Sequence, residues 1–235
     1  TQLSALTPAA VESLSTAQVV SLTTAQMASL STGQLAKMTN AQVFALTTSQ
    51  VAALGTGQVP ALTNTQIKSV QTSALAQLST DQVQALSAPA IAAMSVEQLN
   101  ALTSAQAGAL TTTQTSSLAA VQVKDLSTSF IASLSTQSIA GLSNDQTKAL
   151  STAQIVALTT SQAASLSTNS ISSLNISQVT AIATDDLAKL TTAAVQSLGN
   201  SAVASLTTAQ IAAMTTGQIA ALTTLQFQQL TTSQV

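Results

Sequence analysis

This chain of 235 residues lacks several of the residue types on which most protein chemistry depends. It contains no cysteine, histidine, tryptophan, tyrosine or arginine. Without a thiol or an imidazole, it has neither of the side chains that most often act as nucleophile, general base near neutral pH or soft-metal ligand. We therefore expect no catalytic, metal-binding or cofactor-binding residues and no cofactor, and we expect that the protein is not an enzyme.

Charge is also scarce. Charged residues make up 5% of the chain, against about a quarter in typical soluble domains. Five lysines and seven acidic residues give a net charge of −2, whereas nucleic-acid binding requires a basic surface. Serine, threonine or glutamine interrupts every apolar stretch, so no run approaches the length of a membrane span. The sequence thus argues against nucleic-acid binding and against membrane insertion.

One octapeptide word repeats along the chain without an insertion or deletion. Every eighth residue from Leu6 to Leu230 is apolar, and most of these are leucine. Counted from that residue, the word reads L-[ST]-T-x-Q-[VI]-x-[AS]. Because the register never slips, we expect a single uninterrupted solenoid over residues 1–235. The chain opens on Thr1 and stops in mid-pattern at Val235, which we interpret as a segment of a longer protein.

Each octad carries the signals that start an α-helix. Serine or threonine at position two stands three residues before glutamine at position five, which is the spacing of a capping box. The hydroxyl accepts from the backbone N–H at position five, while the glutamine reaches back to the N-cap. The apolar residues at positions one and six then occupy N′ and N4, the two positions of a hydrophobic staple. The word predicts one short capped helix per octad.

Prolines and charges agree with this frame, with Pro60, Glu12 and Asp125 as the exceptions. Pro8 and Pro89 fall in the first turn, where backbone N–H groups lack partners within the helix. Acidic residues near helix starts and lysines near helix ends suit the helix dipole. The acidic residues at positions four and five are Asp81, Glu97, Asp145, Asp185 and Asp186, and the lysines at positions seven and eight are Lys37, Lys68, Lys124, Lys148 and Lys189. Pro60 at position seven removes an intrahelical hydrogen bond, so we expect a local irregularity there.

The adjacent carboxylates Asp185 and Asp186 are the one place where acidic residues meet in the sequence. We interpret them as a solvated pair in the first turn of a helix, and not as a catalytic dyad. A calcium site needs six or more converging oxygens, which such sparse carboxylates do not supply.

The predicted fold class is all-α, a continuous superhelix of very short capped helices with one helix per octad. A lone helix of one or two turns is unstable in water, so the helices must stack. Positions one and six then form the core. A β-solenoid is the alternative, although positions one and six have opposite parity and cannot share one face of a strand. No super-period of two or three octads is evident, so the number of octads per turn stays open.

Words such as residues 157–162 (ALTTSQ) and 206–211 (LTTAQI) resemble tracts in very large, low-complexity bacterial surface proteins of the adhesin type. The likeness covers the whole chain. It implies an exported structural or adhesive protein, located outside the cell or on its surface, and it brings no catalytic residues with it.

The uniformity of the octads favours a structural role, because a binding site needs positions that differ. We expect a stalk, filament or surface-layer component that associates with itself through the solenoid ends or through lateral faces. Low net charge promotes such association, and no capping repeat covers the ends. The alternative is a binding module whose rows of serine, threonine and glutamine hold glycans or ice, an idea suggested by threonine pairs such as Thr23 and Thr24.

Replacing Leu158, at position one, by aspartate should lower the free energy of unfolding by several kcal/mol. A buried, unpaired charge would take the place of an apolar side chain in the core. Thr180→Asp, at position seven outside the apolar pattern, should be nearly neutral. Urea unfolding of both variants measures the difference, and equal losses would contradict this assignment of inside and outside.

Overall fold

The computed structural model describes residues 5–234, which form short helices and connecting turns and contain no β-strand. Each octad from α1 (Pro8–Glu12) to α27 (Thr224–Gln228) forms one short α-helix, apart from the octad at residues 54–61. The fold is a helical solenoid, as the capping pattern predicts. For the described residues, the β-solenoid alternative is wrong.

Contacts group the chain into two units, Thr1–Leu118 and Ala119–Val235. Because each unit is described by itself, one uninterrupted solenoid over the whole chain stays a prediction. The first unit holds α1 (Pro8–Glu12), α2 (Thr16–Val20), α3 (Thr24–Ala28), α4 (Thr32–Lys37), α5 (Asn40–Ala45), α6 (Thr48–Ala52), the 3-10 helix η2 (Val59–Ala61), α7 (Asn64–Ser69), α8 (Thr72–Leu75), α9 (Thr80–Ala85), α10 (Ala88–Ala93), α11 (Val96–Asn100), α12 (Ser104–Ala109) and α13 (Thr112–Ser116).

The second unit repeats the same pattern. It holds α14 (Ala120–Asp125), α15 (Thr128–Ser133), α16 (Thr136–Ala140), α17 (Asn144–Ala149), α18 (Thr152–Ala157), α19 (Thr160–Ser165), α20 (Thr168–Ser173), α21 (Ile176–Thr180), α22 (Thr184–Lys189), α23 (Thr192–Gln196), α24 (Asn200–Ser205), α25 (Thr208–Ala213), α26 (Thr216–Ala221) and α27 (Thr224–Gln228).

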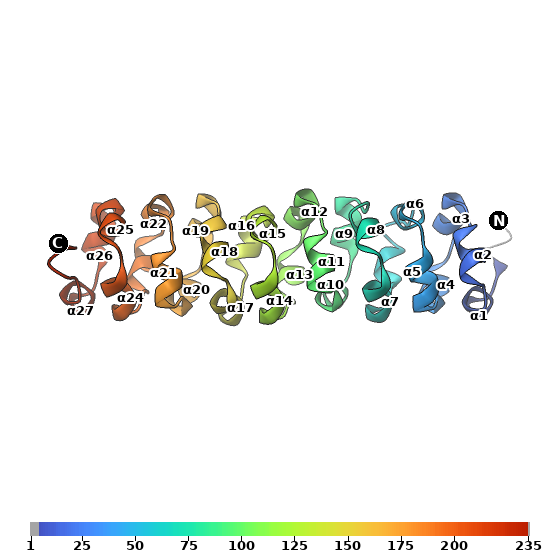
Figure 1. The fold of residues 1–235 in the computed structure, drawn as a ribbon, viewed down its shortest axis with the longest axis horizontal. Helices are drawn as coiled ribbons and strands as arrows, with labels where there is room; N and C mark the ends of the chain where they lie inside the picture. The colour runs from blue at the N-terminus through green and yellow to red at the C-terminus, as the bar shows by residue number, and fades with distance from the viewer. Residues whose placement is uncertain (1–4, 235) are drawn as a thin grey trace. The chain divides into compact units, whose positions relative to one another are not determined.

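Three octads complete one turn of the solenoid in each unit. In the first unit α1 packs on α4, α2 on α5 and α3 on α6, and in the second unit α14 packs on α17 and α19 on α22. Within each unit, Figure 1 shows successive helices winding around a common interior, with each coil beside the next. A helix therefore lies against the helix three octads away in the sequence, and every third helix contributes to the same face.

The chain changes direction between helices through two extended residues. In the junction between α5 and α6, Leu46 has φ −57° and ψ 136°, and Thr47, the N-cap of α6, has φ −71° and ψ 157°. The N–H of Leu46 donates to the carbonyl of Val43, which closes the last turn of α5. No described residue has a positive φ. Such corners suit L-amino acids, so the repeat needs no glycine to turn.

The core consists of positions one and six, as predicted. Val19 and Leu35, both at position six, are completely buried, and Leu158 at position one is 6% exposed. Thr180 at position seven is half-buried, and its hydroxyl donates back to the carbonyls of Ile176 and Ser177 within its own helix. Position five is buried in most octads as well, although it usually carries glutamine; Gln18 in the first coil is exposed.

The prolines lie where the sequence places them. Pro8 is the first residue of α1, and Pro89 is the second residue of α10. The octad of Pro60 forms a turn and the 3-10 helix η2, so the predicted irregularity is confirmed. Even there, Val59 is buried and Gln58 keeps its place in the corner of the coil. One distorted octad does not break the winding, since its contacts with neighbouring coils are preserved.

Candidate functional site

The N-terminus of most helices is closed by the predicted capping box. In α7, the Gln66 N–H donates to the Thr63 hydroxyl over 3.3 Å, and Gln66 Oε1 accepts from the Thr63 N–H over 2.8 Å. The same reciprocal pair is formed in α2, α9, α18 and α26. Each cap of this kind stabilises a helix by about 1 kcal/mol. This local part of the design follows from the sequence alone.

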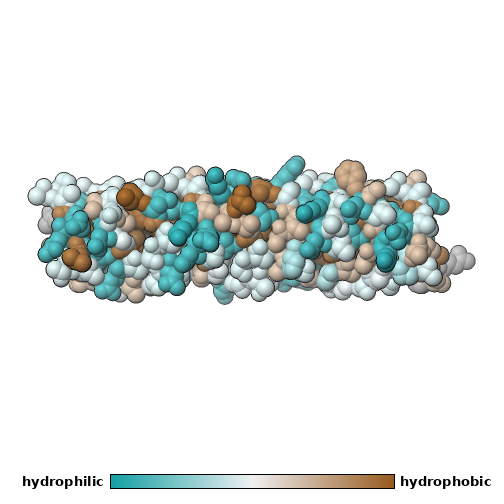
Figure 2. Space-filling model, turned by 90° about the horizontal axis from the view of Figure 1, so that it is seen from below, coloured by the Kyte–Doolittle hydropathy of each residue, from teal (hydrophilic) through white to brown (hydrophobic). Residues whose placement is uncertain are grey.

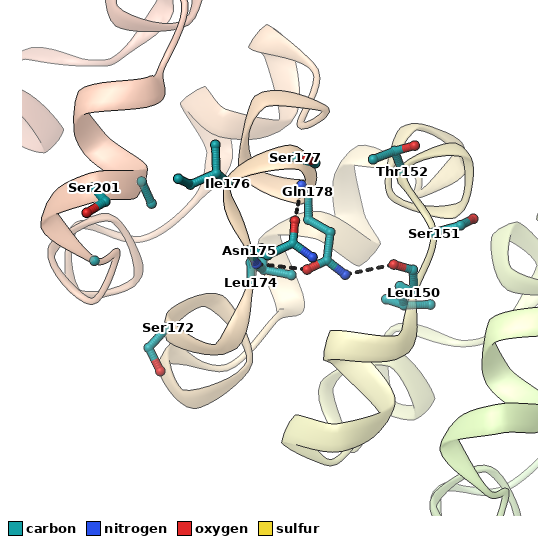
Figure 3. Close-up of a pocket in the computed structure, with 12 residues that line it drawn as sticks. Leu150, Ser151, Thr152, Ser172, Leu174, Asn175, Ile176, Ser177, Gln178 and Ser201 are labelled. Atoms are coloured by element: carbon teal, nitrogen blue, oxygen red, sulfur yellow. Dashed lines mark hydrogen bonds between the residues drawn. The ribbon is translucent and has the colours of Figure 1, made fainter.

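The amide nitrogen of the same glutamine links one coil to the coil before it. Gln50 Nε2 donates to the carbonyls of Val19, Val20 and Leu22 over 2.9, 3.2 and 2.8 Å. These carbonyls lie 31, 30 and 28 residues earlier in the sequence, at the end of α2 and the start of the next octad. Figure 3 shows this arrangement for Gln178, which lies between the N-cap Asn175 and Leu150 of the previous coil.

Of the carbonyls that the glutamines meet, those at positions seven and one receive no backbone N–H, whereas the one at position six also accepts from position one of the next octad, as Val19 does from Leu22. The last carbonyls of a helix have no intrahelical donor, and a buried polar group without a partner is costly. Gln42, Gln154 and Gln178 are each 1% exposed. The Oε1 of each carboxamide accepts from the N-cap N–H of its own helix, and the Nε2 donates to carbonyls of the previous coil. One side chain thus satisfies backbone donors and acceptors that have no partner within a helix. Sequence reasoning identified the accepting oxygen but missed the donating nitrogen.

In one octad, a glutamine at the N-cap, and not at position five, donates to the coil before. Position five of α8 is Ala74, and its N-cap is Gln71 in place of serine or threonine. Gln71 Nε2 donates to the carbonyl of Phe44 over 2.8 Å. Phe44 lies 30 residues before Ala74, just as Val20 lies 30 residues before Gln50. The Phe44 carbonyl is therefore one of the three that a glutamine at position five would reach. The amide is thus supplied from the N-cap where position five cannot supply it.

In another octad, no side-chain amide is present at position five or at the N-cap, and a pocket lies at this corner. In α24, position five is Ala202 and the N-cap is Gly199, which gives no side-chain hydrogen bond. A pocket of about 720 Å³ opens there, lined by Ser172 and Leu174 at the end of α20 and by Asn175 and Ile176 at the start of α21. In Figure 3 the side chains of Ile176 and Ser201 lie on the opposite side of Gln178 from Leu150. This pocket is the candidate ligand site of the second unit.

The pocket combines an apolar wall with hydrogen-bonding groups. Ile176 is 51% exposed, while Ser151, Thr152 and Ser201 bring hydroxyl groups to the lining. A carbon atom added at Gly199 would meet nothing within 4 Å. The site has no titratable side chain, so it can bind a ligand but offers no group for acid–base catalysis.

The adjacent carboxylates have unequal environments. Asp185 is exposed, but Asp186 occupies position five of α22 and is only 5% exposed. The interpretation of the two residues as a solvated pair is therefore wrong for Asp186, because position five faces the buried corner of the coil. Over residues 5–234, no three acidic side chains come together as they would in a metal cluster.

The outer surface is polar with isolated apolar residues. Figure 2 shows separate hydrophobic spots among hydrophilic and neutral atoms on one face. The large apolar side chains that are exposed include Val20, Phe44, Val121, Val156 and Leu225. Single exposed apolar residues are normal on soluble proteins and do not define an interface. Among the described helices, none combines the length and the apolar character that a membrane crossing needs.

Short capped helices stacked at a fixed register define this chain as a tandem-repeat protein with a helical solenoid fold. The family model described as the ALTTAQ repeat matches residues 1–32, 28–64 and 179–216. These stretches contain the L-[ST]-T-x-Q word that forms the capping boxes of α2 and α25. No curated protein matches the chain.

Gln66→Glu should separate the two roles of the glutamine. Glutamate keeps an oxygen for the Thr63 N–H, but its carboxylate cannot donate to the carbonyls of Leu35 and Met38, which Gln66 Nε2 reaches over 2.8 and 2.7 Å. We expect a loss of about 2–4 kcal/mol in the free energy of unfolding at pH 7. Burial raises the pKa of a carboxyl group, so part of this loss should be recovered as the pH falls and the group becomes a donor.

Gln84→Glu is the matched control for this substitution. Gln84 is exposed at position seven, and the same change of charge there should alter stability by less than about 0.5 kcal/mol. Chemical denaturation at pH 7 and pH 4 measures both variants. Equal effects at the two positions would show that the amide nitrogen does not hold the coils together.

Proposed function

We propose that this protein is a structural repeat protein, a segment of an extracellular or cell-surface stalk or filament that assembles with copies of itself. The observation that carries the proposal is the repetition of one inter-coil contact. Gln50, Gln66 and Gln98 in the first unit, and Gln162 and Gln210 in the second, all donate to the carbonyls 31 and 28 residues before them. Such a contact can be repeated without limit.

The described residues leave donors and acceptors of this contact unused. Gln18 and Gln26 form capping boxes in the first coil, but their Nε2 atoms donate to no carbonyl of the described residues. At the other end, no glutamine of the described residues donates to the carbonyls of Met214 and Leu222, although Leu190 and Leu198 receive such bonds one coil earlier. Donors and acceptors of equal spacing are complementary, so a second copy or further octads would extend the solenoid.

A heterologous contact that does not close into a ring propagates as a filament. The half-buried Leu14 and Leu22 in the first coil, and Ile219 and Leu222 in the last, add apolar surface to such a contact. Low charge and the absence of cysteine are compatible with export. Catalysis, cofactors, nucleic-acid binding and membrane insertion have no part in the proposed function.

Sedimentation velocity at tens of micromolar tests self-association through the ends. We expect oligomers that grow with protein concentration, and Gln26→Glu should weaken the association at least about tenfold, because a carboxylate would face carbonyl oxygens. Gln137→Glu, at an exposed position of α16, adds the same charge away from the ends and should leave the association unchanged. A monomer that persists as concentration rises would contradict the filament proposal.

A second function, glycan binding, is favoured by a separate observation, the pocket at Gly199 and Ala202. Sugars bind through hydroxyl groups and an apolar ring face, and the pocket offers Ser151, Thr152, Asn175 and Ser201 beside the exposed Ile176. As a binding module, the protein would present this pocket on a rigid solenoid. The hydroxyls and the amide of the pocket support a glycan ligand rather than ice.

A glycan array followed by titration calorimetry tests this second function. Ala202→Gln would restore the amide of position five and fill the pocket, so glycan binding should fall at least about tenfold while stability stays equal or rises. Ala212→Gln places the same side chain at an exposed position of α25 and should leave binding intact. Equal binding by both variants, or no binding by the unaltered chain, would contradict the glycan function.

A further inference from the structure

Asp186 occupies a corner of the solenoid that glutamine fills one coil before and one coil after. Gln162 in α19 donates to the carbonyls of Ile131, Ala132 and Leu134 over 3.0, 3.2 and 2.7 Å. Gln210 in α25 donates to those of Val179, Thr180 and Ile182 over 3.0, 3.4 and 2.8 Å. In α22, which packs between these helices, the same position carries a carboxylate.

The corner at Asp186 has acceptors but lacks the usual donor. Gln162 reaches carbonyls 31, 30 and 28 residues before it. Counted back from Asp186 by the same separations, the carbonyls of this corner are those of Ile155, Val156 and Leu158. No side chain of the described residues donates to these three oxygens, and Ile155 alone accepts a capping N–H, from Leu158. Asp186 is only 5% exposed, and its carboxylate forms no hydrogen bond or ion pair with a described residue, although its oxygens keep some contact with solvent. A negative charge is thus added where the other coils have a donor.

Neighbouring helices supply no compensating charge. The elements around this corner, α18, α19, α21 and α25, contain no lysine, and Lys189, one turn after Asp186 in α22, is exposed and forms no ion pair with it. The N-cap of α22 is Ala183, which has no hydroxyl group, so the capping box is absent as well. A buried carboxylate requires a partner, because its desolvation costs far more than that of a neutral amide.

We propose that this corner binds a monovalent cation of the size of potassium or ammonium. Its ligands would be the Asp186 carboxylate and the carbonyls of Ile155, Val156 and Leu158. In the adjacent coils, the glutamine nitrogen lies 2.7–3.4 Å from its three carbonyls. Such spacing exceeds the distances of about 2.3–2.6 Å for calcium and about 2.0–2.1 Å for magnesium. Carbonyl oxygens are known ligands of dehydrated potassium.

The shorter side chain of aspartate leaves room for the ion. Aspartate has one methylene group fewer than glutamine, so its oxygens stop short of the point that Nε2 occupies in the other coils. A cation at that point contacts the same carbonyls and neutralises the carboxylate. The residual exposure of Asp186 gives the ion a path to solvent. The sequence predicts no metal site here, because three of the four ligands are backbone atoms.

Thermal unfolding of the whole chain in matched salts tests the proposal. At equal ionic strength, the melting temperature should be higher in potassium or ammonium chloride than in sodium or choline chloride. Above the dissociation constant, it should rise by roughly 3–5 °C for each tenfold increase in potassium concentration. Asp186→Gln restores the amide and should remove this selectivity. Asp185→Asn removes one exposed charge from the same helix and should retain it.

Binding of thallium(I) nitrate, followed by ²⁰⁵Tl NMR and competed with potassium nitrate, tests the site without relying on stability. A bound resonance in the unaltered chain and in Asp185→Asn, but not in Asp186→Gln, is the expected result. Identical melting temperatures in all four chlorides would overturn the proposal and leave water as the occupant. A melting temperature that depends on pH but not on the identity of the cation would also overturn it, in favour of a protonated carboxyl group.

Discussion

The buried carboxamide at position five holds this solenoid together. A helix of four to six residues has almost no intrahelical hydrogen bonds of its own, so most of its backbone groups need outside partners. Glutamine meets this need twice, with its oxygen on the N–H of its own N-cap and its nitrogen on the carbonyls of the coil before. A carboxylate can only accept and an alanine can do neither. Among common side chains, the length and the paired donor and acceptor of glutamine fit both partners.

This double role couples local structure to long-range packing. The capping box fixes where each helix begins, and that fixes where the amide nitrogen lies relative to the preceding coil. The apolar residues at positions one and six then meet those of the neighbouring coils, so a single register sets both the hydrogen bonds and the core. Stability accumulates coil by coil, as in other repeat proteins. Such coupling explains why the octads tolerate the irregular turn at Pro60.

Departures from the repeat are the places where this protein can acquire properties beyond support. At Gln71 the amide is supplied from a different position and the contact survives. At Gly199 and Ala202 the amide is missing and a pocket opens. At Asp186 an acceptor replaces the donor. The three outcomes differ because the corner of the coil is a fixed set of carbonyls, and each substitution changes only what faces them.

The helices, their caps and the core positions all follow from the sequence. These features depend on residues close together within one octad, and the spacing of Thr63, Gln66 and Ile67 is enough to reveal them. The pocket at Gly199 and the buried environment of Asp186 were not visible, because both depend on residues that neighbouring coils bring together.

The closure of three octads into a coil and the bridging of coils by the glutamine nitrogen depend on the three-dimensional arrangement of the chain. Every octad presents the same word, so no longer period in the sequence marks which octads become neighbours. The two extended residues between helices, such as Leu46 and Thr47, set the angle of each corner, and three such corners bring the chain back onto itself. Closure of a coil is a property of accumulated backbone geometry, and no pattern of side chains within one repeat encodes it.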